Sequence, residues 1–359
     1  MVNCLRVPKS EGESVRSELM AQGLLDLSHR ISSDGGDLLI PITCDSFGDY
    51  SVEEADAAEQ GVRPKEYREV VRDVPDELRE LLPVSFDVVG DIAMIRIPDE
   101  LLPYSRQIGE ALIEANRNIR AAFRDSGVKG EFRIRELEKI AGEGGSETAH
   151  REFGVTLYSD PSKVYFNPRL SSERSRIAGL VEDGEVIIDM FGGVAPFGTV
   201  IGKLAHPSAI YSIDLNPAAE EYALKNAKKN RIKVLHPMTG DSSKVVYTLP
   251  EADRIIMNLP QIADRFLCYA MDRLKVGGTA HMYKILERSE FEGFKRALAE
   301  DIASKGFGIR ISSFELKTYS PTMSVYSLDI LRASRRWRQG AVMRPSHCFL
   351  GVNVTPVCP

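Results

Sequence analysis

Hydrophobic and polar positions follow different patterns in the two halves of the chain. From about Glu185 onward, short apolar runs predict strands, and longer segments with helical periodicity separate them. Repeated strand–helix units of this length predict a doubly wound, mostly parallel α/β sheet. The predicted strands are 186–190, 209–213, 254–257, 278–283 and 325–331, and the predicted helices are 217–230, 263–274 and 289–304.

The first half of the chain predicts two smaller modules. A helix at 10–22 and a strand at 37–42 form the first, and an acidic, alanine-rich stretch at 51–60 (SVEEADAAEQ) then indicates a linker. The second module has predicted strands at 84–89 and 92–97, a helix at 102–123, and further strands around Phe132 and Val155. We therefore expect a small domain at 1–46, a linker at 47–63, an α+β domain at 64–168, a doubly wound domain at 169–331 and a basic tail at 332–359.

Composition limits the partner without identifying it. The chain has 46 Lys and Arg against 52 Asp and Glu, and this net charge of −6 argues weakly against nucleic acid. Phosphate binding depends on where the cations lie, however, and residues 114–175 are dense in arginine. Acidic residues are interleaved there, so a surface of ion pairs explains the segment equally well. No apolar run approaches the roughly 20 residues of a membrane span, so no membrane association is expected.

Cysteine usage bears on metal binding and on the cellular compartment. The five cysteines are scattered, odd in number and without CxxC spacing. This pattern argues against a zinc site and a disulfide framework, and it fits a reducing cytoplasm. The N-terminus lacks the apolar stretch of a secretory signal. We therefore expect a cytoplasmic protein without a metal, and no obligate protein partner is evident.

The first strand of the doubly wound half ends in a glycine-rich turn, residues 189–198 (DMFGGVAPFG). Open α/β sheets bind nucleotide-like ligands at the carboxyl end of the first strand. The spacing is not GxGxxG, and Pro196 lies in the turn, so no clean helix N-terminus is expected for a pyrophosphate. This favours a ligand without phosphates, such as S-adenosylmethionine. A purely structural glycine turn is nearly as good an explanation of the turn alone.

Acidic residues follow the next two strands. Asp214 ends the second strand, where a carboxylate can accept both ribose hydroxyls of a nucleoside. The alternative is a helix N-cap at Asn216-Pro217, and the two roles can coexist. After the third strand region, Asp241-Ser242 places a carboxylate where an adenine amino group can meet it. Three such features in this order favour a nucleoside-binding methyltransferase sheet.

The fourth strand ends in Asn258-Leu259-Pro260. Many methyltransferases that modify planar nitrogens have Asn-x-Pro at this point. The amide and a neighbouring carbonyl hold the planar edge in line with the methyl sulfonium, and the proline stiffens the loop. The structural alternative is an Asn turn that leaves a strand. At this position in the sheet the functional interpretation is favoured.

The order of the motifs resembles that of one family. Segments 130–138 (GEFRIRELE), 163–170 (KVYFNPRL) and 172–176 (SERSR) precede the Asp-Met-Phe turn, Ile-Asp-Leu-Asn-Pro, Asn-Leu-Pro and 317–321 (KTYSP). This order resembles the archaeal and eukaryotic tRNA guanine-37 N1-methyltransferases, over about residues 1 to 331, including the N-terminal domain of the longer archaeal members. The resemblance implies a Rossmann-like class I methyltransferase domain after two small α/β modules. It also implies S-adenosylmethionine as cofactor and tRNA as substrate.

The resemblance assigns roles to individual residues. Glu173 would be the general base that removes the guanine N1 proton, because N1 of neutral guanine is not a nucleophile. Arg133 would bind the base and stabilise the charge that develops on O6. Asn258 and Pro260 would hold the base. The other implied roles are nucleotide positioning by Tyr165 and Arg169 and a cofactor pocket formed by Arg174, Asp189, Phe191, Gly193, Asp214, Leu215, Asp241, Ser242, Asn258 and Pro260.

Each of these residues also has a simpler explanation when taken alone. Glu173 with its neighbouring arginine would be a surface ion pair, Arg133 a solvated cation and Tyr165 a core aromatic. Ala195 departs from the glycine usual in the family turn, which would strain the backbone if this residue has a positive φ. The arginine-rich tail 332–359 lies beyond the resemblance and is either a basic arm that touches tRNA or an unstructured extension.

The resemblance leaves three other functions open. One is aminocarboxypropyl transfer from the same cofactor in the wyosine pathway, against which Asn258-Leu259-Pro260 argues. Another is a dual-specificity enzyme that also methylates a wyosine precursor. A third is a non-catalytic tRNA-binding homologue. For the favoured function, the appended modules would grip the tRNA body while the catalytic domain takes a flipped-out guanosine from the anticodon loop.

Overall fold

A computed structural model describes residues 2–58, 66–130, 132 and 134–335. These residues form two compact units, one made of the residues up to 74 together with 114–117, the other of 75–113 and the residues from 118 onward. Arg133 and residues 336–359 of the predicted tail lie outside the described residues. Within the described ranges, no helix is long and apolar enough to span a membrane.

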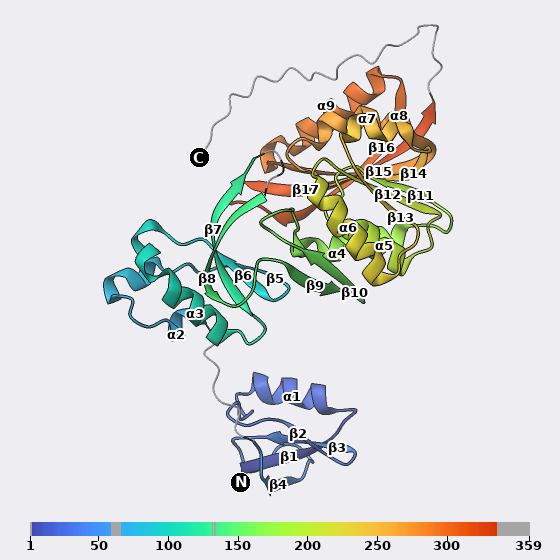
Figure 1. Ribbon diagram of the computed structural model, residues 1–359. Coiled ribbons are helices and arrows are strands. Elements are labelled where there is room, and N and C mark those ends of the chain that lie inside the picture. The colour runs from blue at the N-terminus through green and yellow to red at the C-terminus, as the bar shows by residue number, and fades with distance from the viewer. Residues whose placement is uncertain (1, 59–65, 131, 133, 336–359) are drawn as a thin grey trace. The chain divides into compact units, whose positions relative to one another are not determined.

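The first unit contains a four-stranded antiparallel sheet in the order β2-β3-β1-β4 (Figure 1). Its small core forms between the sheet and one helix, where Leu5 and Val7 pack with Val15, Leu19 and Ile40. The predicted helix at 10–22 and strand at 37–42 are confirmed within two residues at each end. The elements of this unit are β1 (Val2–Pro8), α1 (Gly12–Ala21), β2 (Ser32–Asp34), β3 (Asp37–Pro41), β4 (Val52–Ala55) and α2 (Tyr67–Val70).

The stretch predicted as a linker contains strand β4. Val52–Ala55 pairs antiparallel with β1, with Val2 opposite Ala55. Its acidic side chains serve an edge strand, since Glu53 forms an ion pair with Arg6 across the pair of strands at 2.7 Å. Acidic composition therefore misidentified an edge strand as a linker, and the N-terminal fold extends beyond the predicted end at residue 46.

The second unit begins with a four-stranded sheet in the order β5-β6-β7-β8, followed by the hairpin β9-β10. The predicted helix at 102–123 is only partly correct, because it ends at Ala115 and residues 121–129 form β7, parallel to β6. Phe132, predicted near a strand, lies in a turn. The elements are η1 (Asp76–Leu81), β5 (Asp87–Val89), β6 (Ile92–Ile95), η2 (Asp99–Tyr104), α3 (Ser105–Ala115), β7 (Ala121–Lys129), β8 (Ile134–Gly142), β9 (Thr148–Glu152) and β10 (Val155–Ser159).

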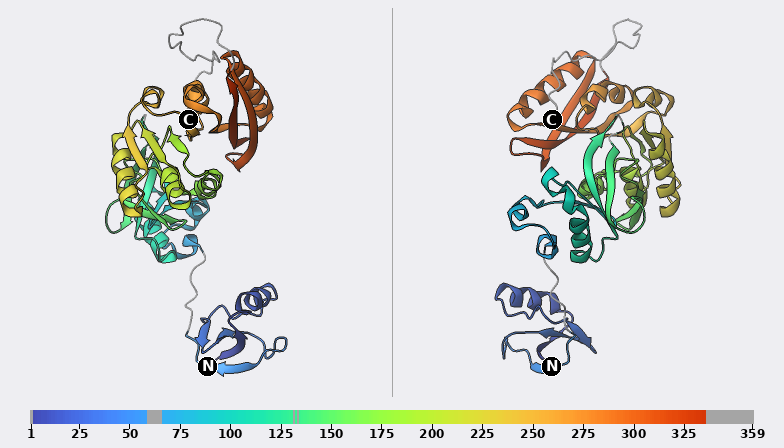
Figure 2. Two further views of the ribbon diagram at one scale, coloured as in Figure 1. Left: turned by 90° about the vertical axis from the view of Figure 1, so that its right-hand side faces the viewer. Right: turned by 60° about the vertical axis from the view of Figure 1, so that its left-hand side comes forward.

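The larger sheet has the order β13-β12-β11-β14-β15-β17-β16 (Figure 1). The first five strands in this order run parallel, and β17 and β16 continue the sheet as antiparallel strands at one edge (Figure 2). The chain adds β12 and β13 on one side of β11 and β14 and β15 on the other, so the order of connection reverses between β11 and β14. Ligands of open α/β sheets bind at the carboxyl ends of the strands at such a reversal.

Helices cover both faces of this sheet (Figure 1). Ile187 and the next residue, Ile188, belong to two different core clusters, as expected for a parallel strand that is buried on both faces. The helical part consists of η3 (Pro168–Leu170), α4 (Ser171–Leu180), α5 (Pro196–Leu204), α6 (Pro217–Asn230), α7 (Ser242–Val245), η4 (Val246–Thr248), η5 (Ala263–Phe266), α8 (Leu267–Arg273), η6 (Arg288–Glu290) and α9 (Phe291–Ser304). The strands are β11 (Val186–Asp189), β12 (Ala209–Asp214), β13 (Leu235–Thr239), β14 (Ala252–Met257), β15 (Leu274–Glu287), β16 (Phe307–Thr318) and β17 (Met323–Arg335).

The predicted doubly wound sheet is confirmed, and further elements beyond the prediction complete it. Helix 217–230 agrees with α6 at both ends, and each predicted strand of this half overlaps an observed one. The further elements include α4, α5 and β16, which were not predicted from the sequence. Pro196, whose place in the turn was expected to leave no clean helix N-terminus, is instead the first residue of α5, a position where the missing amide hydrogen costs nothing.

Candidate active site

The glycine-rich turn connects β11 to α5 and lies against the end of β12. The Gly192 amide donates to the Ile213 carbonyl at 2.8 Å, and a Cβ at this position would overlap the Ser212 hydroxyl. Gly193 has φ +53° and donates its amide to Oδ2 of Asp214 at 2.8 Å. Gly192 is therefore required by the close approach of the turn to β12, and Gly193 is favoured by its positive φ.

Ala195 has the positive φ that the sequence analysis named as a source of strain. Its φ and ψ are 56° and 47°, in the left-handed region, and its methyl group is fully buried. This conformation costs an alanine roughly 1–2 kcal/mol. Burial of one methyl group stabilises the folded state by about 0.8 kcal/mol, so packing of the Ala195 side chain offsets much of the backbone strain. The turn keeps its conformation in spite of the substitution.

Asp214 lies at the carboxyl end of β12 with its carboxylate held by the backbone. Oδ2 accepts the Gly193 amide, and Oδ1 accepts the Asn216 amide at 2.9 Å. Burial raises the pKa of this carboxyl group, and the backbone hydrogen bonds only partly oppose the shift. Asn216 caps α6 by accepting the Ala218 amide at 3.0 Å. The helix cap is thus Asn216, and Asp214 is the residue proposed to bind the ligand. The two roles can therefore coexist, as predicted.

Asp241 and Ser242 follow β13. Oδ1 of Asp241 accepts the amide and the hydroxyl of Ser243, so this carboxylate caps the short helix α7. Burial would raise the pKa of Asp241, but the hydrogen bonds from Ser243 and the nearby Lys244 lower it. Asp241 therefore remains an anionic acceptor at the edge of the site, and Ser242 beside it is buried.

The Asn258-Leu259-Pro260 loop leaves the end of β14 and is fixed to β15. The Pro260 carbonyl accepts the Ile285 amide at 3.1 Å. Lys284 reaches under the loop and contacts Asp264 at 2.6 Å and the Gln261 carbonyl at 3.1 Å. Among the described residues, the Asn258 side chain has no hydrogen-bond partner, so its amide is free to meet a planar substrate edge.

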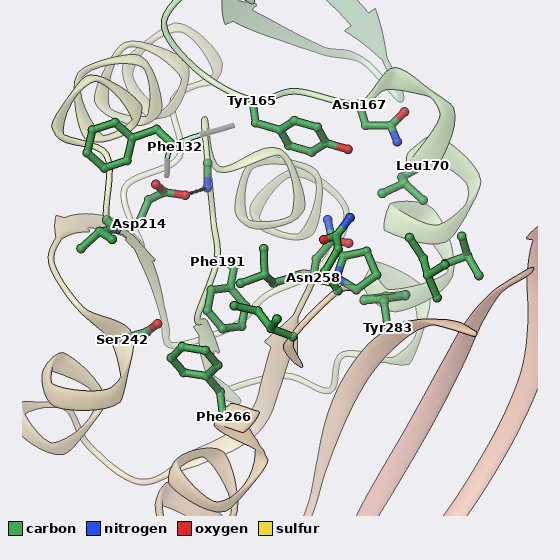
Figure 3. Close-up of a pocket in the computed structure, with 18 of the residues that line it drawn as sticks. Phe132, Tyr165, Asn167, Leu170, Phe191, Asp214, Ser242, Asn258, Phe266 and Tyr283 are labelled. Carbon is green, nitrogen blue, oxygen red and sulfur yellow. Dashed lines mark hydrogen bonds between the residues drawn. The ribbon is translucent and has the colours of Figure 1, made fainter. Parts of the chain in front are cut away.

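These segments surround one pocket of about 340 Å³, a size typical of small-molecule sites (Figure 3). Asp214 and Ser242 lie toward one end with Phe191 and Phe266, whose rings contact edge to face with centroids 5.0 Å apart. Asn258 and Tyr283 lie toward the other end. The lining residues are Phe132, Tyr165, Asn167, Leu170, Phe191, Gly193, Asp214, Leu215, Asp241, Ser242, Asn258, Leu259, Pro260, Gln261, Ile262, Phe266, Tyr283, Ile285, Lys317, Tyr319 and Val325.

Nine of the residues predicted for the site therefore line one pocket, although they come from four different strand ends and from the segment before α4. The nine are Tyr165, Phe191, Gly193, Asp214, Leu215, Asp241, Ser242, Asn258 and Pro260. Tyr165 is 43% exposed, so it is not a core aromatic. Their convergence follows from the parallel sheet, which brings the carboxyl ends of its strands to one edge.

Four other predicted residues do not line this pocket. Arg174 is buried and holds Glu152 through two hydrogen bonds of 2.5 and 2.6 Å, so it fixes the hairpin β9-β10. Asp189 is fully buried, and one of its oxygens has no hydrogen-bond partner among the described residues. Arg169 is exposed and paired with Asp87 at 2.6 Å. The fourth of these residues is Glu173. A further predicted residue, Arg133, lies outside the described residues.

Glu173 is 2% exposed and lies on α4, facing the sheet. Arg176, one turn later, donates to both carboxylate oxygens at 2.7 and 2.8 Å. The Tyr283 hydroxyl donates to Oε1 at 2.7 Å, and the Ser327 hydroxyl lies 3.4 Å from the same oxygen. Glu173 is therefore a buried, fully engaged carboxylate and not the surface ion pair considered as the simpler explanation.

Several residues that line the pocket were not predicted from the sequence. Tyr283 and Phe266 lie in segments that were predicted only as a strand and a helix, with no motif to mark them. Lys317 and Tyr319 stood in the quoted KTYSP motif without an assigned role. Burial lowers the pKa of Lys317, and the nearby Arg169 lowers it further. The motif was the one signal that pointed to these two residues.

In the arginine-dense segment 114–175, most of the described arginines form ion pairs. This agrees with the interpretation of the segment as a surface of ion pairs. Five of its arginines have acidic partners within 3.0 Å: Arg120 with Asp91, Arg124 with Glu138, Arg135 with Asp125, Arg169 with Asp87 and Arg174 with Glu152. In the described part of the chain, no group of three His, Cys, Asp or Glu side chains is arranged to hold a metal ion.

Comparison with protein families matches most of the chain to three related domains. The TRM5/TYW2 methyltransferase domain matches residues 148–312, and the TYW2 N-terminal domain matches residues 67–145. The tRNA methyltransferase 5 N-terminal domain matches residues 4–50. These matches follow one another along the chain in the order of the observed modules.

Two curated relatives show how far the similarity extends. The chain is 39% identical to the tRNA (guanine(37)-N(1))-methyltransferase Trm5b of Pyrococcus abyssi, over 92% of this chain and 98% of the relative. It is 33% identical to the tRNA 4-demethylwyosine(37)-methyltransferase Taw21 of Saccharolobus solfataricus, over 67% of this chain and 92% of the relative. The stronger similarity also covers the larger share of this chain.

Two solved structures share the fold at similar identity. The complex structure of aTrm5 and tRNALeu is 34% identical, with a TM-score of 0.65, and covers 91% of this chain and 98% of the other. The Methanocaldococcus jannaschii Trm5 in complex with adenosine is 31% identical, with a TM-score of 0.63, and covers 93% of this chain and all of the other.

Proposed function

Since the chain belongs to the TRM5/TYW2 methyltransferase family, we infer that it transfers the methyl group of S-adenosylmethionine to N1 of guanosine 37 in tRNA. One observation carries this inference. The pocket joins an end suited to a nucleoside, with Asp214 and two phenylalanines, to an end where Asn258 and Pro260 can hold a planar base. A methyl donor at the first end would face a base at the second.

The residues at the first end fit the cofactor by their chemistry. The Asp214 carboxylate can accept ribose hydroxyls, and its backbone hydrogen bonds fix its direction. Phe191, Phe266 and Ile262 provide apolar surface for the adenine ring, and Asp241 with Ser242 provides polar groups for its edge. Gly193 leaves space that a side chain would fill, beside the Tyr165 carbonyl. When bound, S-adenosylmethionine supplies an electrophilic methyl group on a positively charged sulfur.

The protein would supply proton removal, charge stabilisation and orientation. We propose Glu173 as the general base for the N1 proton, Arg133 as the group that stabilises the charge on O6, and Asn258 with Pro260 as the holder of the base. Tyr165 and Arg169 would position the nucleotide. Asp189 and Arg174 would support the cofactor site without lining it. Asp189 would support the glycine-rich turn that follows it. Arg174 would act through the Asn167-Pro168 turn, because it donates to both of its carbonyls.

For tRNA itself we propose two contact regions. The pocket would take guanosine 37 flipped out of the anticodon loop, at the energetic cost of unstacking that is typical of enzymes that modify single bases. The N-terminal unit would grip the tRNA body. A unit tethered in this way raises the effective concentration of the second contact once the first has formed.

A wyosine precursor is the alternative substrate that one observation favours. The chain is 33% identical to a 4-demethylwyosine methyltransferase, so the same pocket is a candidate for a tricyclic base. The Asn258-Leu259-Pro260 loop argues for methyl transfer over aminocarboxypropyl transfer in either case.

The test is a set of reactions with labelled S-adenosylmethionine and tRNA transcripts that carry G, inosine or A at position 37. G and inosine share the N1 hydrogen and O6, so both should be methylated, whereas A lacks both and should not react. Nucleoside mass spectrometry would identify the product as 1-methylguanosine or 1-methylinosine. A fourth tRNA with 4-demethylwyosine at position 37 tests the alternative. Methylation of that tRNA alone, with the G37 transcript unchanged, would replace the proposed substrate.

A further inference from the structure

The position of Glu173 raises the question of how it reaches its substrate. The carboxylate is 2% exposed and is not among the residues that line the pocket. Its two oxygens already hold the Arg176 guanidinium at 2.7 and 2.8 Å. To touch guanine directly, Glu173 would have to leave a buried ion pair, which is costly because it leaves a buried charge without its partner.

Tyr283 connects this buried carboxylate to the pocket. Its hydroxyl donates to Oε1 of Glu173 at 2.7 Å, and Tyr283 itself lines the pocket. Met257 and Met282 are paired neighbours on β14 and β15, so Asn258, which follows the end of β14, lies beside Tyr283, which is within β15. The tyrosine therefore lies beside the amide proposed to hold the guanine edge (Figure 3).

We propose that Tyr283 carries the guanine N1 proton to Glu173. This inference rests on the proposed function and assigns the second proton-transferring group of the same site. A phenol donates one hydrogen bond and accepts others at the same time, so the oxygen that donates to Glu173 can also accept the N1 hydrogen. Glu173 then acts as the base without leaving its ion pair.

The proposed step is balanced in protons and electrons. The N1–H bond breaks and its proton moves to the Tyr283 oxygen, while the Tyr283 proton moves to Oε1 of Glu173. The electron pair left on N1 forms the new N1–methyl bond, and the sulfur–methyl bond breaks with its electrons returning to sulfur. Tyr283 ends as a neutral phenol, Glu173 as a neutral acid, and the spent cofactor as a neutral thioether.

The surroundings of Tyr283 favour such a relay over an independent tyrosinate. Burial and the neighbouring Glu173 charge raise the pKa of Tyr283 well above its usual value, so the phenol stays protonated and serves as a donor. The ring is 1% exposed and packs against Phe197. Ser327, paired with Tyr283 across β15 and β17, contacts the same carboxylate oxygen and helps to hold it in place.

Arg176 is a positioning residue in this arrangement. It also donates to Asp329 at 2.8 Å, and Asp329 is held by His281 at 2.6 Å. His281 and Asp329 are paired across β15 and β17, two residues before Tyr283 and after Ser327 respectively. The network thus fixes the Arg176 guanidinium through Asp329 as well as Glu173, which keeps the Glu173 carboxylate directed at the phenol.

The experiment compares Tyr283→Phe with the parent in single-turnover methylation of the G37 transcript, with 1-methylguanosine measured by mass spectrometry. Phenylalanine keeps the ring and removes the proton carrier. We expect the rate to fall at least about 100-fold, the lower end of the range typical of a lost proton-transfer group, with cofactor and tRNA affinities within threefold of the parent. Because the relay makes the two residues one unit, Tyr283→Phe combined with Glu173→Gln should be no slower than Glu173→Gln alone.

A matched control uses another buried tyrosine that donates to a carboxylate. Tyr222 on α6 donates to Glu147 at 3.0 Å and does not line the pocket. Tyr222→Phe loses the same kind of hydrogen bond and should methylate at the parent rate. Melting temperatures of both variants report whether a loss of folding accounts for a loss of rate.

Two further measurements test the relay, the first on the parent protein alone and the second by a spectrum of the resting protein. The single-turnover rate in mixtures of H₂O and D₂O should curve with the deuterium fraction, because two protons move in the same step. In protein labelled at the tyrosine hydroxyl-bearing carbon, the Tyr283 resonance, assigned by its loss in Tyr283→Phe, should shift in Glu173→Gln without any turnover. A straight dependence on deuterium, or an unmoved resonance, would overturn the relay.

The outcomes separate the relay from the proposed function. If Tyr283→Phe forms 1-methylguanosine at the parent rate, the function stands and the relay is wrong. If the two substitutions multiply their losses, Tyr283 acts independently of Glu173 and the relay is also wrong. If the parent forms no 1-methylguanosine at position 37, the proposed function falls and the relay falls with it.

Discussion

Replacement of Asp214 by alanine tests the nucleoside end of the pocket most directly. The substitution removes the carboxylate that is proposed to accept the ribose hydroxyls. It also removes the acceptor of two backbone hydrogen bonds, from the Gly193 amide at 2.8 Å and the Asn216 amide at 2.9 Å. The first effect acts on cofactor binding alone, whereas the second acts on the folded turn as well. We expect both.

The size of each effect follows from the bonds lost. A hydrogen bond to a charged group contributes about 1.5–3 kcal/mol, so two ribose hydroxyls correspond to roughly 3–6 kcal/mol of binding free energy. At about 1.4 kcal/mol for each factor of ten, the cofactor dissociation constant should rise about 10²–10⁴-fold. Gly193 lines the pocket and Asn216 follows the lining residue Leu215, so we expect water in the pocket to replace the lost acceptor. The free energy of unfolding should therefore fall by only about 1–2 kcal/mol.

Titration calorimetry with S-adenosylmethionine measures the first effect, and chemical denaturation measures the second. Asp253→Ala is the matched control, because Asp253 accepts the Val186 amide at 2.8 Å outside the pocket. That variant should lose comparable stability and keep the cofactor affinity of the parent. Affinity for tRNA should stay within threefold in both. A cofactor affinity of Asp214→Ala within threefold of the parent would refute the assignment and leave Asp214 as a structural residue of the turn.

Three further predictions concern the base, the N-terminal unit and a buried acid. Glu173→Gln should bind cofactor and tRNA as the parent does and lose about 10²–10⁴-fold in single-turnover rate; transfer at the parent rate would exclude it as the base. Deletion of residues 1–58, which removes β1 together with its partner β4, should weaken tRNA binding while the single-turnover rate at saturating tRNA is kept; unchanged tRNA affinity with lost turnover would indicate a structural role. Burial raises the pKa of Asp189 from 3.8 to about 7. The free energy of unfolding of the cofactor-free protein should therefore be highest, relative to a variant without this carboxyl group, below about pH 4 and lowest above pH 7. Denaturation of parent and Asp189→Asn from pH 4 to 7 should show the parent losing up to roughly 4 kcal/mol relative to the variant, and parallel curves would contradict this.

The sequence predicted those parts of the fold whose physical cause is local. Continuous apolar runs and helical periodicity identified the doubly wound half, because both faces of its parallel strands are buried. The predictions failed where a distant strand decided the outcome. Residues 121–123 continue a helical pattern, yet they form β7 because β6 offers a parallel partner. Val52–Ala55 is acidic enough for a linker and becomes β4 because β1 has a free edge.

The candidate site divides in the same way. Motifs at the ends of successive strands identified Asp214, Asp241 and Asn258 from the sequence, since the topology of a parallel sheet by itself brings strand ends to one edge. Only the tertiary structure showed that Glu173 contacts Tyr283, because these two residues are 110 residues apart and no local pattern records that their side chains meet. A short local motif specifies a residue type at a strand end. The partner that completes its chemistry depends on packing between distant segments.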